Sequence, residues 1–194
     1  QSGTFRDTAS STYDFAVYNF AQSGRGGTVW RCYRSYFAFD LSGFTGTATA
    51  VDFEVRGDNL GSTDSNSSTV YMVAATSFAG ATSDFTNIFT SGTTLGTLYG
   101  SGTISTTGGF HTLTGNSDMV TAVNNVVGSG TLYLGLMGYY DYNNSSPSVG
   151  GNFTKIQLQF SEMSTGKQPF LSVTGITAST TGYGAEFMVE SDAI

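Results

Sequence analysis

The sequence predicts an all-β protein, built as a jelly roll or another two-sheet antiparallel β-sandwich with one short helix. Apolar or alternating β-rich runs recur along the 194 residues, and turns rich in Gly, Ser and Thr separate them. Only one segment has convincing helical periodicity. The strand–helix–strand rhythm that predicts a parallel sheet is absent. We count roughly eight strands, which is typical of a sandwich.

Four strands are expected in the N-terminal part, at residues 13–20, 28–41, 47–56 and 69–77. In the second strand Phe37 and Phe39 share one face, and Arg34 and Tyr36 share the other, because successive strand residues point in opposite directions. The run at 69–77 is apolar throughout most of its length, so we expect it to be covered on both faces.

The strand at 47–56 has a period of two, which indicates that one of its faces is solvated. Its inward residues are predicted to be Val51, Phe53 and Val55, and its outward residues Asp52, Glu54 and Arg56.

The predicted helix covers residues 116–127, with Ser117 as its expected N-cap and Asp118 favouring its positive end. Gly128 is expected to end it. Three strands then follow, at 131–137, 153–160 and 169–176. Pro169 stands at the start of the last one, where a strand tolerates proline.

One sandwich domain is expected over residues 1–176, because all-β domains often reach this size. Residues 177–194 differ in composition, with a Ser/Thr/Gly stretch before an amphipathic and acidic segment. This part could be an extra strand, an arm that docks on a neighbouring subunit, or a linker to another domain.

The charge balance excludes some partners. A formal net charge of −7, from 7 Lys+Arg and 14 Asp+Glu, gives no attraction to nucleic acid or to an anionic membrane. No apolar run is long enough to span a membrane, so membrane insertion is not expected. Cys32 is the only cysteine and is interpreted as a small buried hydrophobe. Because the chain opens on Gln1, we expect a processed protein or an excised segment.

Three stretches, in this order, resemble the DNRLRE-type β-sandwich modules. They are RSYFAFDLS at 34–42, the helix followed by GTLYLGLMGYYDYNNSSP, and FSEMSTGKQPFLSVTG at 160–175. The likeness covers roughly residues 10–175. It implies a jelly-roll binding or assembly module of the kind found in carbohydrate-active secreted proteins, cell-surface proteins and phage virion proteins. The resemblance supplies no catalytic residues, and it ends before the C-terminal segment.

The densest candidate binding site follows the strand at 131–137, where three tyrosines, an aspartate and two asparagines stand together. The predicted ligand-binding residues are Tyr139, Tyr140, Asp141, Tyr142, Asn143 and Asn144. Exposed rings would stack on sugar C–H faces, and the polar side chains would hydrogen-bond hydroxyls. Alternatively, the rings pack over the end of the sandwich while Asp and Asn close turns with their own backbone.

Metal and catalytic chemistry have weaker signals, and no cofactor is expected. Asp141 with Asn143, or the polar residues at 58–66, could offer oxygen ligands to Ca²⁺, but neither set matches a calcium-loop motif. His111 is the only histidine, and no serine elbow, metal-ligand histidine pair or phosphate-binding loop accompanies it. We therefore interpret it as structural, and predict no catalytic residue.

The function expected from these observations is that of a non-enzymatic module on a virion surface or in an extracellular setting. Such a phage tail-fibre or decoration module would serve adhesion, by carbohydrate binding or receptor attachment, or structural assembly. Its expected partners are a surface glycan or a structural protein of the virion or cell surface, and we expect a homo-oligomer. The alternatives are a carbohydrate-binding module of a secreted polysaccharide-degrading enzyme, or a small polysaccharide lyase or hydrolase.

Overall fold

The computed structural model describes residues 4–6, 14–24, 27–59, 68–77, 88–91, 94–104, 109–145, 154–158, 168–178 and 187–193. Its elements are β1 (Thr4–Arg6), β2 (Asp14–Gly24), β3 (Gly27–Asp40), β4 (Phe44–Asn59), β5 (Thr69–Ala74), β6 (Phe89–Ser91), β7 (Thr94–Leu95), β8 (Leu98–Thr103), β9 (Gly109–Thr114), α1 (Ser117–Val126), β10 (Thr131–Gly138), α2 (Tyr139–Tyr142), β11 (Thr154–Leu158), β12 (Phe170–Ala178) and β13 (Phe187–Ala193).

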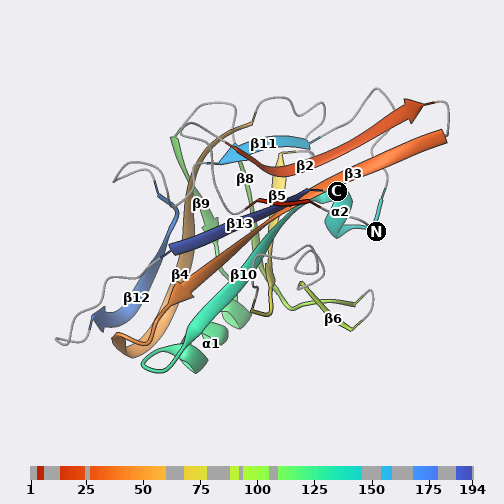
Figure 1. Ribbon diagram of the computed structural model, residues 1–194. Coiled ribbons are helices and arrows are strands. Elements are labelled where there is room, and N and C mark those ends of the chain that lie inside the picture. Colours follow the sequence, from red (N-terminus) through yellow and green to blue (C-terminus); the bar gives the residue numbers. More distant parts are fainter. Residues whose placement is uncertain are drawn as a thin grey trace.

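The strands form a two-layer antiparallel β-sandwich, as the sequence predicts (Figure 1). One layer contains β13, β3, β10, β5 and β8, hydrogen-bonded in that order. The other contains β12, β4 and β9. The hydrogen-bonded network continues from β4 to β3 through β11 and β2, which join the two layers at one side. Whether the strands follow the particular order of a jelly roll stays a prediction.

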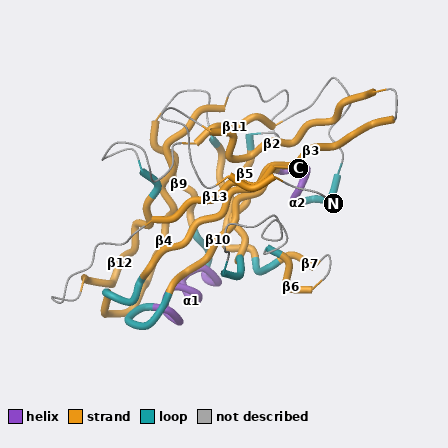
Figure 2. Tube along the Cα trace, viewed as in Figure 1, coloured by secondary structure: helices purple, strands orange, loops and turns teal. Residues whose placement is uncertain are grey.

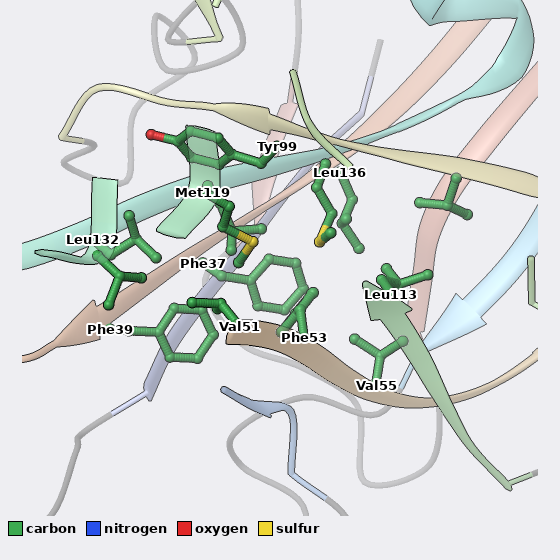
Figure 3. Close-up of a cluster of buried hydrophobic side chains, with 14 of the residues drawn as sticks. Phe37, Phe39, Val51, Phe53, Val55, Tyr99, Leu113, Met119, Leu132 and Leu136 are labelled. Carbon is green, nitrogen blue, oxygen red and sulfur yellow. The ribbon is translucent and has the colours of Figure 1, made fainter. Parts of the chain in front are cut away.

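Aromatic side chains from the facing layers meet in the core (Figure 3). Phe37 and Phe39 of β3 both contact Phe53 of β4 edge-on, with ring centroids 4.8 and 5.6 Å apart. Edge-to-face packing at such distances is a favoured arrangement of aromatic rings. Val51 and Val55 are buried on the same side of β4 as Phe53. The inward face predicted for β4 is therefore confirmed, and Phe37 and Phe39 share one face of β3 as expected.

A second apolar cluster lies on the other face of β3, β10 and β5. It contains Tyr36, Val73, Ile88 and Met137, all buried. Ile88 approaches the sheet at Gly135, where a Cβ atom would lie 2.5 Å from its Cγ2 atom. A side chain at Gly135 would therefore force Ile88 to shift. β5 thus carries buried side chains on both faces, as expected for residues 69–77.

Helix α1 packs against β4, β8 and β10 at one end of the sandwich (Figure 1). Its N-cap is Asn116, not Ser117 as expected. The Asn116 Oδ1 atom accepts hydrogen bonds from the backbone N–H groups of Asp118 (3.0 Å) and Met119 (3.1 Å). Its Nδ2 atom donates to the Leu98 carbonyl at 2.8 Å. Asn116 ties the helix start to β8 in a way that the shorter hydroxyl of Ser117 does not.

Tyr99 of β8 lies near the start of α1, where it is buried and close to the charged Asp118. Burial, and secondarily the negative charge of Asp118, raise the pKa of the Tyr99 phenol above its usual value. Both effects favour the neutral phenol, which is the form suited to the core.

The C-terminal strands extend beyond the predicted domain boundary. β12 continues to Ala178, past the boundary expected at residue 176, and β13 pairs with both β3 and β1. This pairing is that of an extra strand, one of the three possibilities for residues 177–194. Whether these residues form a unit separate from 1–176 stays a prediction.

Candidate functional site

The six predicted ligand-binding residues form a helical turn and its continuation, and we call residues 139–144 the tyrosine turn. α2 begins directly after β10, and its Tyr139 carbonyl accepts hydrogen bonds from the Asn143 backbone N–H (3.0 Å) and the Asn143 Nδ2 atom (2.9 Å). Asn144 has a φ of 47°, a left-handed conformation in which Asn is enriched. The asparagines thus close the turn, while both remain exposed.

An ion pair fastens the tyrosine turn to the sheet. Arg34 of β3 donates from Nε to Asp141 Oδ2 and from its NH2 nitrogen to Oδ1, both at 2.7 Å. The two side chains are only 6% and 8% exposed. Such a two-point contact fixes the carboxylate orientation as well as its position. Asp141 therefore acts as an anchor for the turn, and its oxygens already hold two charged hydrogen bonds.

The tyrosine rings pack beside this anchor. Tyr142 stacks on Tyr71 of β5, with ring centroids 4.1 Å apart and planes 7° apart. Tyr139 meets Tyr140 edge-on at 5.4 Å, and Tyr140 is buried. Tyr139 and Tyr142 are half-buried. Part of each ring surface therefore packs against other side chains of the protein. The assignment of the tyrosine turn as a ligand site stays a prediction.

His111 lies on β9, on the inward-facing alternation that also carries buried Leu113. Its Nε2 atom is 3.1 Å from the Gly57 carbonyl oxygen, within hydrogen-bonding distance. The side chain is half-buried and has a partner in the neighbouring strand, which fits a structural role.

The oxygen ligands expected for calcium belong to two sets, Asp141 with Asn143 and the polar residues at 58–66. Asp64 and Asn66 lie outside the described residues, and Asp141 is paired with Arg34. Within the described ranges, no group of three or more His, Cys, Asp or Glu could hold a metal ion. In the same ranges, no helix is both long and apolar enough to cross a membrane.

A second candidate site lies on the outward face of the β12–β4–β9 layer, and sequence reasoning missed it. We call it the open face and define it by Glu54, Arg56, Phe110, Thr112 and Phe170. Among the described residues, Phe110 and Phe170 are the large hydrophobic side chains that are exposed, at 42% and 39%. Their rings contact each other edge-on, with centroids 5.6 Å apart.

The strand register explains how this pair forms. Arg56 of β4 is paired with Phe110 of β9, and Glu54 is paired with both Phe170 of β12 and Thr112 of β9. Phe110 and Phe170 are therefore diagonal neighbours across β4. No short-range sequence pattern reveals this, because each phenylalanine stands on a different strand and only the pairing brings the rings together.

Polar groups frame the two rings. The Thr112 hydroxyl donates to the Glu54 carboxylate at 2.9 and 3.0 Å, and the Arg56 guanidinium carbon lies 6.0 Å from the Phe110 ring centroid. The Arg56 Nε atom is buried and, within the described part of the chain, has no hydrogen-bond partner. The open face thus combines an apolar ring surface with an acceptor and a donor at its border.

Comparison with known proteins finds no matching family model, no matching curated protein and no matching solved structure. The resemblance to DNRLRE-type modules stays an expectation from the sequence.

Proposed function

We propose that this chain is a non-enzymatic β-sandwich module that attaches to a surface glycan, in an extracellular or virion-surface setting. The observation that supports the proposal is the exposed Phe110–Phe170 pair on the outward face of a regular sheet. Adjacent exposed rings on a soluble protein commonly mark a binding surface. The virion setting has its support in the sequence resemblance alone.

The chemistry of the open face suits a sugar. A pyranose ring presents C–H groups on its faces and hydroxyls around its rim. The phenylalanine rings would contact the C–H groups, while Glu54 would accept hydrogen bonds from hydroxyls and Arg56 would donate to them. The Glu54 carboxylate has about four acceptor positions, of which the Thr112 hydroxyl occupies one or two, so capacity for a ligand remains.

The proposal is tested on a glycan array with the wild type and with Phe110→Ala and Phe170→Ala. Each substitution is expected to weaken binding about tenfold or more, which corresponds to about 1.4 kcal/mol or more. Thr114→Ala is the matched control, since Thr114 is exposed on β9 beyond the aromatic pair. Binding should survive this change.

The same array decides between the two candidate sites. If Tyr142→Ala abolishes glycan binding at unchanged thermal stability while Phe110→Ala does not, the tyrosine turn is the site. If the wild type binds no glycan on a broad array, the attachment proposal fails.

Structural assembly is the second candidate function, and it is favoured by the edge of β12 that has no strand partner in the described part of the chain. A module that decorates a particle or fibre must join its neighbours, and an open strand edge is one of the ways in which proteins associate.

A further inference from the structure

Strand β12 lies at the margin of its layer (Figure 2). Among the strands that the structure describes, it pairs with β4 alone. Its opposite edge therefore presents a row of backbone N–H and C=O groups without a strand partner in the described part of the chain. Such an edge is a template for another strand.

The edge lacks most of the devices that usually protect one. The residues of β12, FLSVTGITA, include no charged side chain and no proline. Proteins commonly place Lys, Pro or a bulge on an exposed edge to prevent pairing. Within the described residues, two such features lie close to it: Pro169 directly precedes the strand, and an irregularity stands between Thr174 and Ile176, where Gly175 has a φ of 97° and a Cβ would collide with the Thr47 carbonyl. Residues 170–174 pair regularly with β4 and have no strand on their other edge among the described residues.

We propose that residues 170–174 pair with the same strand of a second copy of this chain, antiparallel and about a two-fold axis through Ser172. In this register Ser172 faces Ser172 of the second copy, Phe170 faces Thr174, and Leu171 faces Val173. The contact is isologous, because the same patch serves both copies.

The side-chain pattern of the segment fits a second copy. Phe170, Ser172 and Thr174 are exposed on the outward face, so they meet across the join without a buried charge. Leu171 and Val173 are half-buried on the inward face and already pack against the core. Pairing Leu171 with Val173 of the second copy would extend each core across the interface.

A second copy could meet this edge without a local charge penalty, although the molecule as a whole is acidic. The protein carries a formal net charge of −7, so two copies repel each other over most approaches. The uncharged edge of β12 brings no like charges directly opposite each other. If the two-fold axis is perpendicular to the sheet, the open faces of both copies lie on the same side of one continuous sheet. The pairing itself does not depend on glycan binding.

The first experiment is a charge exchange at the proposed axis, read by sedimentation equilibrium of the full chain. The wild type should associate to dimers as its concentration rises. Ser172→Lys or Ser172→Glu alone should weaken association about tenfold or more, because like charges would face each other. An equimolar mixture of the two variants should restore a dimer, since opposite charges would then meet. Thr114→Lys, on the same sheet face in β9, is the matched control and should leave association unchanged.

A wild type that stays monomeric at all accessible concentrations overturns the proposal. So does a dimer that Ser172→Lys leaves intact, or a mixture of the two variants that stays monomeric. These outcomes are separate from the glycan test, because a monomer can still bind sugar through Phe110 and Phe170.

A cross-linking experiment checks the register. Under mild oxidation, Ser172→Cys should form a covalent dimer, because directly opposed antiparallel residues have Cα atoms about 4.5–5.5 Å apart, within disulfide range. The wild type, with Cys32 as its only thiol, controls for other links, and Thr114→Cys controls for random collision. Equal cross-linking of Ser172→Cys and Thr114→Cys would contradict the two-fold register.

Discussion

The tyrosine turn and the open face are both aromatic and polar, yet the fold uses them differently. In the turn, Asp141 is held by Arg34 and Tyr142 lies flat on Tyr71, so the polar and aromatic groups satisfy one another. On the open face, Phe110 and Phe170 contact each other but keep about two-fifths of their surface in solvent. A dense run of binding-type residues in sequence therefore does not predict exposure, whereas sheet pairing can create an exposed site from scattered residues.

The largest expected effect is at the ion pair. Asp141→Ala should lower the free energy of unfolding by about 3–5 kcal/mol, because the buried Arg34 guanidinium would lose both of its hydrogen bonds to that carboxylate. Chemical denaturation monitored by circular dichroism measures the change. Glu54→Ala is the control on the open face and should change stability by about 0.5 kcal/mol or less.

The double variant Arg34→Met, Asp141→Leu tests whether the loss in Asp141→Ala comes from the buried charge of Arg34. With both charges removed, much of the stability lost in Asp141→Ala should return. If Asp141→Ala is no more harmful than Glu54→Ala, the tyrosine turn is not anchored as described.

A smaller effect is expected at the stacked rings. Tyr142→Ala should cost about 1–2 kcal/mol, since it removes the stacking on Tyr71 and part of the buried ring surface. Tyr142→Phe keeps the ring and should be close to neutral. Thermal melts of the two variants check this, and equal losses would show that the hydroxyl, not the ring, matters.

The open face should tolerate loss of its rings. Phe110→Ala and Phe170→Ala are each expected to cost about 0.5–1 kcal/mol, because only the contact between two partly exposed rings is lost. The same denaturation assay applies. A loss of several kcal/mol from either change would make the pair part of the core and remove the contrast with the tyrosine turn.

The smallest effect is expected from Thr112→Val. Thr112 is exposed, so removing its hydrogen bond to Glu54 should alter stability by about 0.5 kcal/mol or less. The useful readout is the glycan array, where a freed carboxylate should change the affinity of any ligand that Glu54 contacts. Unchanged affinity would place the ligand away from Glu54.

Much of the sandwich could be predicted from local patterns. The alternation through Val51 and Phe53 identifies the inward face of β4, because burial of one face imposes a period of two on a strand. In β3 the pattern shows only that Phe37 and Phe39 share a face, since Tyr36 on the opposite face is buried as well. The helix is also visible, but its cap is displaced by one residue. Asn116 caps the helix in place of Ser117 because its longer side chain reaches the Leu98 carbonyl as well as the helix N–H groups. The contact with Leu98 is tertiary and cannot be seen in the local sequence.

The candidate sites were harder to predict because they depend on partners distant in the chain. Arg34 and Asp141 are separated by 107 positions, so nothing near Asp141 indicates that its charge is already paired. Phe110 and Phe170 meet only through the register of β12, β4 and β9. Sequence patterns show which face of a strand is polar, but not which strand lies beside it.

The pairing of β13 with β3 and β1 has a consequence for how the chain matures during synthesis. β3 is made early, yet one of its edges is covered only when residues 187–193 have left the ribosome. Until then that edge can mispair with other nascent chains, and the long loop closure slows completion of the fold. Ribosome stalling or truncation ahead of β13 should therefore produce aggregation-prone intermediates.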